Sequence, residues 1–401
     1  MRSDPERLRF EIVARDGGAR AGVMHTPHGP VETPCFVPLA TRGSVKGLLA
    51  DEVRETGYDL VLGNTYHLML TPGGELVAEL GGLHEFMGWD GAIITDSGGF
   101  QVFSLAHGAV ADEVKGRRGR PPLEGGVLSI DEEGVRFRSY IDGSEQFLSP
   151  ERSMEVQAAL GSDIALVFDE CTPFRADRDY TAASTERTHR WLDRCLDWHA
   201  ANRPSRQAVF GIVQGGVYED LRRESAEAVS AAAVDGLAIG GTLGSDKEQM
   251  REVIDMTVGH LAADAPKHLL GIGEPDDLVE GIARGIDSFD CAVPTRLGRH
   301  GMALAPLPEK RFRYDVRRRA NEREAGPLVD GCPCPACTRH TRAYVHYLSR
   351  AEELTGVRLL TLHNLVYTEQ LVSRARAAIV AGSFGSYREA ILAGAAPWEA
   401  G

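Results

Sequence analysis

The sequence predicts an α/β protein built as a (β/α)8 barrel, with antiparallel strands before the barrel and a zinc-binding subdomain after it. The main observation is a repeated unit in which a short apolar run precedes a polar or glycine-rich cluster and then a helical stretch. Apolar runs without alternation are typical of parallel strands buried on both faces. Eight such units in about 260 residues favour a barrel, and a doubly wound sheet is the structural alternative.

Composition limits the class of protein. With 401 residues, of which 43% are hydrophobic, the chain can bury one large core. It contains no run of 18 apolar residues and no apolar run near its N-terminus like that of a signal peptide, so we expect a cytoplasmic protein that does not enter the membrane. Seven cysteines, an odd number, argue against a disulfide framework.

Charge is segregated along the chain. The formal net charge of −14 does not by itself suggest a nucleic-acid partner. Between Arg296 and Arg323, however, eight arginines and one lysine face only three acidic residues. A local excess of this kind predicts a surface that binds an anionic partner such as RNA.

The elements follow in order. Residues 1–30 are expected to form antiparallel strands that pack on the barrel, with strands at 8–14 and 20–24 joined by a turn at 16–18. The barrel domain is expected over 31–305 and the zinc-binding helical subdomain with a C-terminal helix over 306–401. The predicted barrel strands are 35–38, 60–62, 92–94, 164–168, 208–213, 237–239, 268–273 and 288–291, with helices near 50–56, at 181–201 and from 275.

Two segments interrupt the repeated unit. Residues 105–127 are rich in glycine, proline and arginine, which is typical of a long surface loop. Two roles stay open for this insert, a solvated basic loop and a contact with RNA. Residues 128–141 are expected to form a hairpin, with strands at 128–130 and 135–141.

Polar residues stand where the predicted barrel strands end, and active sites of such barrels lie at this end. One polar residue at a strand end means little, because such residues end any strand. Several with convergent chemistry predict an active site, and they are Asn64, Asp96, Asp169, Gln214, Gly241 and Asp290. Asp290 lies between an apolar strand and the basic segment, where an aspartate could act as a nucleophile on an anionic substrate.

A cysteine cluster predicts a metal site. Cys332, Cys334 and Cys337 have the spacing C-x-C-x2-C, with His363 as the best fourth ligand and His340 and His346 as alternatives. Three thiolates and one imidazole complete a tetrahedral zinc site with no open position, so we expect one structural zinc ion. A helix is expected between them, from Ala343 to Leu354, and the remaining four cysteines are expected to be buried and apolar in character.

Five motifs carry a resemblance to a known family. They are Thr95–Leu105 (TDSGGFQVFSL), Phe168–Pro173 (FDECTP), Gly211–Gly216 (GIVQGG), Phe289–Cys291 (FDC) with Pro294–Arg296 (PTR), and the Cys/His cluster. From about residue 9 to 382 the chain resembles bacterial tRNA-guanine transglycosylase, of the queuine tRNA-ribosyltransferase family. The resemblance implies a zinc-containing barrel that exchanges guanine at wobble position 34 of GUN anticodons (Asp, Asn, His and Tyr tRNAs) for a 7-deazaguanine in queuosine biosynthesis.

The resemblance also implies the roles of the catalytic residues. Asp290 would be the nucleophile that forms a covalent aspartyl–ribose intermediate, and Asp96 the general acid/base for the departing and arriving bases. Asn64 would orient Asp96. Such a double displacement is similar to that of a retaining glycosidase with a base as the leaving group.

Four further residues would bind the base edge by resemblance. Asp169 would accept hydrogen bonds from the N1–H and exocyclic amine of guanine, which adenine cannot supply at N1. Gln214 and the backbone N–H of Gly241 would bind the O6 edge. Ser97 belongs to the same substrate-binding set.

Phe100 and Leu270 would sandwich the flipped-out base, with a plain core role as the alternative for each. Arg296 and Arg299 match contacts to the tRNA anticodon loop, and the basic stretch after them would hold phosphates. Bacterial members are homodimers with aromatic residues of the zinc region at the interface. We therefore expect a homodimer, with Tyr344 and Tyr347 in that region and His340 where the family has tryptophan.

One segment departs from the family. After Gly241 the bacterial pattern is Leu-Ala-Val-Gly-Glu, whereas Thr242–Asp246 here is TLGSD and lacks the glutamate that supports the aminomethyl base. We expect 7-aminomethyl-7-deazaguanine as the incoming base, with queuine as the alternative.

Other classes fit less well. A non-catalytic RNA-binding subunit would lack Asp96 and Asp290. An archaeal-type transglycosylase would carry further RNA-binding domains after the zinc region. A small-molecule lyase or glycosidase would not need the arginine-rich segment, and weak salt dependence of tRNA binding would favour it.

Overall fold

A computed structural model describes residues 7–106 and 126–400, except residues 173, 175, 203 and 205. Most of the basic insert predicted at 105–127 lies outside these residues, so both of its proposed roles stay predictions. Within the described part of the chain, no helix is long and apolar enough to cross a membrane.

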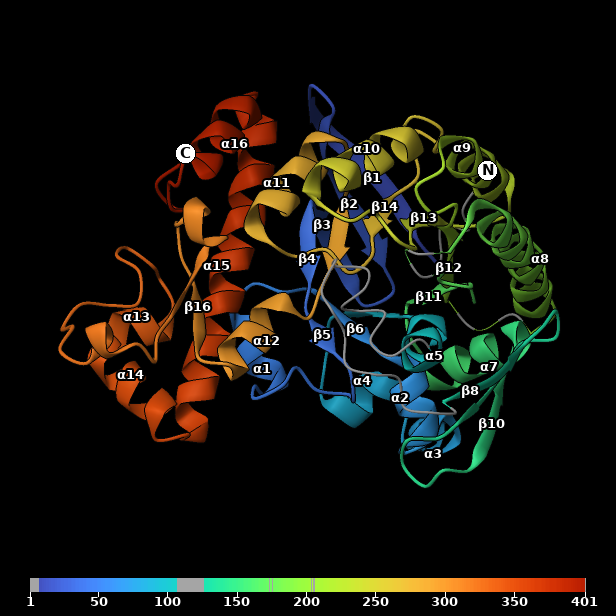
Figure 1. The fold of residues 1–401 in the computed structure, drawn as a ribbon, viewed down its shortest axis with the longest axis horizontal. Coiled ribbons are helices and arrows are strands. Elements are labelled where there is room, and N and C mark those ends of the chain that lie inside the picture. The colour runs from blue at the N-terminus through green and yellow to red at the C-terminus, as the bar shows by residue number, and fades with distance from the viewer. Residues whose placement is uncertain are drawn as a thin grey trace.

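The described residues form a closed parallel barrel, which confirms the predicted fold class (Figure 1). The first barrel strand is broken at Pro38 into β4 and β5, and β4 pairs with β15 while β5 pairs with β6. Proline has no N–H to donate to a sheet, but its carbonyl accepts a hydrogen bond from Leu62 N at 3.0 Å. The strands are β4 (Cys35–Val37), β5 (Leu39–Ala40), β6 (Leu60–Gly63), β7 (Ala92–Thr95), β11 (Ile164–Leu166), β12 (Ala208–Val213), β13 (Gly236–Ile239), β14 (Lys267–Leu269) and β15 (Ser288–Asp290).

Helices surround the barrel (Figure 1). Every residue of β12 is buried, as expected for a strand covered by helices on one face and by the barrel interior on the other. The helices of this part are α1 (Ala50–Glu55), α2 (Thr65–Leu70), α3 (Gly74–Glu79), α4 (Gly82–Met87), α5 (Gly99–Ala106), α7 (Pro150–Leu160), α8 (Arg178–Asn202), α9 (Glu219–Ala231), α10 (Lys247–Val258), α11 (Pro275–Ala283) and α12 (Val293–Arg299).

Two antiparallel sheets each contain one strand more than the sequence predicted. The N-terminal sheet has β1 (Arg9–Asp16), β2 (Ala19–Thr26) and β3 (Gly29–Thr33). The predicted hairpin is extended by a third strand in β8 (Val127–Ile130), β9 (Val135–Arg138) and β10 (Glu145–Leu148). The prediction that the second hairpin strand reaches residue 141 was wrong, because β9 ends at Arg138 and residues 140–142 form a turn in which Gly143 N donates to the Ser139 carbonyl at 2.9 Å.

A buried ion pair fastens the N-terminal sheet to the end of the barrel opposite the strand-end carboxylates. Arg20 of β2 pairs with Asp287, the residue before β15, and both side chains are almost fully buried. Its guanidinium also donates to the carbonyls of Ala263 and Ala265 at 2.6 and 2.7 Å. The arginine thereby connects the N-terminal sheet with β15 and with the segment that precedes β14.

The C-terminal region forms a second, smaller core against α12. The helix predicted from Ala343 to Leu354 ends at Arg350, and a new helix begins at Leu354 after Glu352 adopts a left-handed φ of +58°. The elements are β16 (Met302–Leu304), β17 (Arg313–Asp315), two 3-10 turns (Pro308–Lys310 and Arg319–Asn321), α13 (Pro335–Arg339), α14 (Arg342–Arg350), α15 (Leu354–Ala381) and α16 (Phe384–Leu392).

Candidate active site

The predicted strand-end residues gather at one end of the barrel. Five of these residues lie at the C-terminal end of a barrel strand or within two positions after it, and the sixth, Asp169, follows the end of β11 by three positions. They are Asn64 (β6), Asp96 (β7), Asp169 (β11), Gln214 (β12), Gly241 (β13) and Asp290 (β15), and Leu270, which was predicted as a base contact, directly follows β14. Parallel strands place all their carboxyl ends on the same side, so distant motifs become neighbours.

Asp96 is held by donors from two helices. Its Oδ1 accepts from Thr65 N at 2.9 Å, and its Oδ2 accepts from Gln101 Nε2 at 3.0 Å and from Asn64 Nδ2. The hydrogen bond from Asn64 fits the orienting role that the resemblance implied. Burial raises the pKa of Asp96 to about 7, and the charge of Asp290 acts in the same direction against the hydrogen bonds.

Asp290 is the last residue of β15, and its side chain is 11% exposed. Its Oδ1 accepts hydrogen bonds from His268 Nε2 at 3.1 Å and Gly271 N at 3.2 Å. Because the charge of Asp290 raises the pKa of Asp96, the two carboxylates lie within electrostatic reach of each other. A carboxylate that is fixed by one oxygen and remains slightly exposed can meet an electrophile at the barrel mouth.

Asp169 lies beside Gln214 and Ser97. Ser97 Oγ donates to Oδ1 at 3.1 Å, and Gln214 Nε2 donates to Oδ2 at 2.6 Å. Burial raises the pKa of Asp169 to about 6, although both hydrogen bonds lower it. Gln214 uses one N–H of its amide on Asp169, and the amide has a second N–H for a ligand.

Gly241 is required by space as well as by backbone conformation. Its φ is +78°, and a Cβ there would lie 2.3 Å from Gln214 Oε1. The glycine therefore lets the strand end of β13 approach the side chain that comes from β12.

Arg222 of α9, which was not predicted from the sequence, fixes both of these strand ends. Its buried guanidinium donates to the carbonyls of Gly216 at 2.7 Å, Gly240 at 2.9 Å and Thr242 at 2.8 Å. Burial lowers the pKa of Arg222 to about 10. No sequence signal distinguishes it, because an arginine in a charged helix is expected to face solvent.

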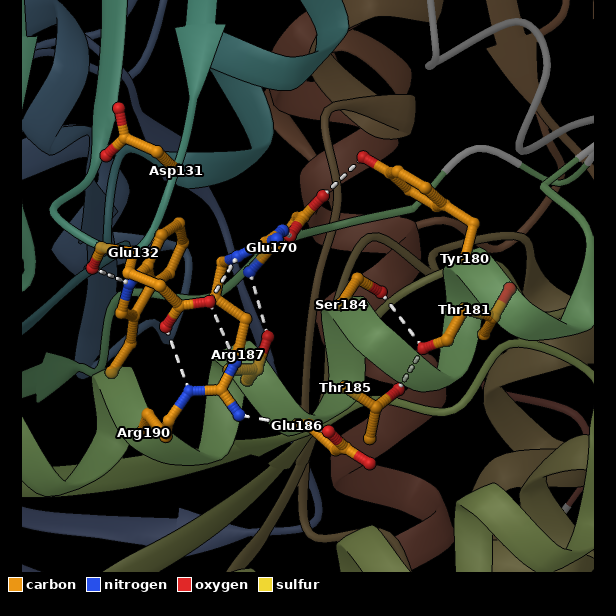
Figure 2. A network of polar contacts seen from close by, with 12 residues as sticks. Asp131, Glu132, Glu170, Tyr180, Thr181, Ser184, Thr185, Glu186, Arg187 and Arg190 are labelled. Atoms are coloured by element: carbon orange, nitrogen blue, oxygen red, sulfur yellow. Dashed lines mark hydrogen bonds and ion pairs between the residues drawn. The ribbon is translucent and has the colours of Figure 1, made fainter.

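Glu170 connects the segment after β11 with α8 and the hairpin (Figure 2). Its carboxylate accepts from Tyr180 OH at 2.6 Å and pairs with Arg187. Arg187 and Arg190 also pair with Glu132, in the turn between β8 and β9. Asp169 directly precedes Glu170, so the backbone segment that carries it is held by α8 and, through Arg187, by the hairpin.

Phe100 and Leu270 are not both core residues. Phe100, the second residue of α5, is exposed, whereas Leu270 is partly buried beside Gly240. The exposure of its ring argues against the plain core alternative for Phe100.

Four cations gather near the end of β15. Arg296 and Arg299 lie on α12, directly after Asp290, and both are partly exposed. Burial and the charges of Arg299 and Arg42 lower the pKa of Lys46, and burial and the charge of Arg296 lower that of Arg299. Arg42 and Lys46, from the β5–α1 loop, were not predicted, because only the fold brings them to α12. Crowded cations of this kind favour binding of an anion.

The cysteine cluster is assembled as predicted. His363 Nδ1 lies 3.6, 3.4 and 3.4 Å from the sulfur atoms of Cys332, Cys334 and Cys337, close to the roughly 3.6 Å expected between ligands of a tetrahedral site. His363 Nε2 bonds to the Leu304 carbonyl at 2.8 Å, which directs Nδ1 at the cluster. These four residues could hold a metal ion.

The other two histidines are engaged elsewhere. His346 Nδ1 bonds to the Val316 carbonyl at 2.8 Å, and His340 stacks on Tyr344. His363 is therefore the histidine that completes the cluster.

The fold and the site define an α/β-barrel enzyme with carboxylate chemistry at its mouth and a Cys3His cluster beside it. The family model described as queuine tRNA-ribosyltransferase matches residues 16–396. The chain belongs to this family, the tRNA-guanine transglycosylases, which confirms the resemblance seen in the sequence.

Curated relatives match this chain over more than nine tenths of their length. The queuine tRNA-ribosyltransferase of Roseiflexus sp. (strain RS-1) is 53% identical over 95% of this chain and 98% of its own. That of Symbiobacterium thermophilum is 47% identical over 98% of this chain and 92% of its own. That of Pelotomaculum thermopropionicum is 48% identical over 96% and 98%.

The buried Asp169 leads to a prediction for stability. Its pKa rises from 3.8 to about 6 in the folded protein, so the cost of burying its charge is absent below pH 3.8 and complete above about pH 6. Asp169→Asn keeps an acceptor for Gln214 and can donate to Ser97 Oγ. We expect it to raise the free energy of unfolding by about 2 kcal/mol more at pH 8 than at pH 4.5.

Urea unfolding of both proteins at the two pH values measures this difference. Asp193→Asn, at an exposed position of α8, is the control and should show no such dependence. An Asp169→Asn effect of equal size at both pH values would show that the carboxyl is not held at a raised pKa.

Proposed function

We propose that this enzyme exchanges guanine at position 34 of GUN anticodons for 7-aminomethyl-7-deazaguanine through a covalent aspartyl–ribose intermediate. The observation that carries the proposal is the pair of carboxylates at the barrel mouth. Asp96 has a pKa near 7, and Asp290 lies close enough to influence it. Breaking and remaking an N-glycosidic bond needs a nucleophile and a proton carrier in this arrangement.

The two carboxylates have separate tasks. Asp290 attacks C1′ of the ribose as the C1′–N9 bond breaks, and its ester is then displaced by the incoming base. Asp96 gives a proton to the departing guanine and takes one from the arriving base. A pKa of about 7 suits both tasks at neutral pH, because the protonated and ionised forms are then both populated.

The base binds between the ends of β11, β12 and β13. Asp169 accepts from the N1–H and the exocyclic amine, while Gln214 and Gly241 N donate to O6. Ser97 keeps the Asp169 carboxylate oriented through its 3.1 Å hydrogen bond. Phe100 and Leu270 cover the two faces of the base.

The anticodon loop binds across the cations at the mouth. Arg296 and Arg299 contact it beside the nucleophile, and Arg42 and Lys46 extend the positive surface to the β5–α1 loop. We also propose a homodimer through the zinc region, where Tyr344 and Tyr347 are exposed.

The preference for the incoming base depends on the loop after Gly241. Asp246, the last residue of the segment that departs from the family pattern, accepts from Gln249 N at 3.0 Å as the N-cap of α10. The Asp246 carboxylate therefore caps α10 and does not take the place of the missing glutamate. Queuine is the second candidate, because the loop lacks that family-specific support for the aminomethyl group.

The incorporation of radiolabelled guanine into tRNA tests the reaction and the base together. We expect tRNA with guanine at position 34 to take up the labelled guanine, and the same tRNA with adenine there to be inert. Unlabelled 7-aminomethyl-7-deazaguanine should compete at lower concentration than queuine. Label incorporated outside position 34 would contradict the proposed substrate, and stronger competition by queuine would overturn the base assignment.

We propose zinc as the metal of the Cys3His cluster. Three thiolates and an imidazole are the donor set of a closed structural zinc site, and the helix that carries His363 packs on α12 beside the arginines. The metal would therefore fix the subdomain against the RNA-binding side of the barrel and take no part in the chemistry.

Metal removal tests this role. Purified protein should contain one zinc ion per chain by elemental analysis, and Cys334→Ala should lose it together with thermal stability. Cys195→Ala, a buried cysteine of α8, is the control and should keep the metal. Full zinc content in Cys334→Ala would contradict the ligand assignment.

A further inference from the structure

His268 carries an inference about how the nucleophile is aimed, and this inference rests on the proposed function. We propose that His268 is a positioning residue that fixes Oδ1 of Asp290 and so selects Oδ2 as the attacking atom. The two hydrogen bonds that described residues make to this carboxylate, from His268 Nε2 and Gly271 N, both end on Oδ1.

Strand register places the histidine. His268 of β14 lies directly opposite Ser288 of β15, and Asp290 is two residues further on the same face as Ser288. The imidazole therefore spans both side chains, with Nδ1 2.8 Å from Ser288 Oγ and Nε2 3.1 Å from Asp290 Oδ1. Its exposed fraction is zero, so water does not compete for either contact.

The partners determine which nitrogen carries the proton. A lone pair on Nε2 would face the Asp290 carboxylate and repel it, so the proton lies on Nε2 and is donated to Oδ1. Nδ1 is then an acceptor, and the Ser288 hydroxyl donates to it. Ser288, His268 and Asp290 thus form a directed chain of hydrogen bonds that ends on the nucleophile.

The arrangement affects the bond-changing steps. When Oδ2 bonds to C1′, the C1′–N9 electron pair leaves with the base, and Oδ1 becomes the carbonyl oxygen of the ester. When the incoming base attacks C1′, the Oδ2–C1′ pair returns to the carboxylate as negative charge. The donors His268 and Gly271 stabilise that returning charge, so their loss slows chemistry more than tRNA binding.

Steady-state kinetics of guanine exchange test the inference. We expect His268→Leu to lower kcat by about 10- to 100-fold while KM for tRNA stays within about twofold, because a transition-state interaction is lost. His268→Gln should recover about tenfold of this loss, since its amide N–H can take the place of Nε2–H.

A matched control separates positioning from general disruption. His199→Leu replaces a buried histidine of α8 and should leave kcat unchanged. Wild-type kcat in His268→Leu would overturn the inference. The inference would also be overturned if both His268 variants lost kcat and showed an equally large rise in KM for tRNA and for the base. Failure of the wild-type enzyme to exchange guanine would contradict the proposed function instead.

Discussion

The closure of the barrel at its first strand is the constraint on which the site depends. β4 completes the ladder to β15, β5 completes the ladder to β6, and Pro38 between them still accepts a hydrogen bond from Leu62 N. Without this closure β15 would be the open edge of a flat sheet, and Asp290 and Asp96 would lie on strands far apart in that sheet. Closure brings them to the same mouth, although 194 residues separate them in the chain.

Burial at this mouth then gives the carboxylates different properties. Asp96 has a pKa of about 7 and Asp169 of about 6, because desolvation outweighs the hydrogen bonds that each accepts. Asp290 keeps slight exposure and two donors on one oxygen. Similar side chains thereby acquire the different properties that the proposed roles of proton carrier, base acceptor and nucleophile require. The cost of burying the first two is offset elsewhere, by apolar strands that are buried on both faces.

The sequence was sufficient for the features that depend on local pattern. The eight strands, their polar ends and the cysteine spacing follow from short-range order, so the positions of Asp96, Asp169 and Asp290 could be predicted. His268, Arg222 and Lys46 could not, because their importance depends on strand register or on loops that meet only in the fold. β3 was missed because Pro30 makes its short segment a poor strand by pattern, and it forms on the edge of its sheet.

Capture of the covalent intermediate tests most directly whether Asp290 is the nucleophile. Wild-type enzyme mixed with tRNA should give a protein–RNA adduct that persists in a denaturing gel, and digestion followed by mass spectrometry should place the ribose on the peptide containing Asp290. Asp290→Ala should give no adduct. In the wild-type adduct, the neighbouring Phe289 and Cys291 should carry no ribose. An adduct of equal yield in Asp290→Ala would contradict the assignment and leave another residue as the nucleophile.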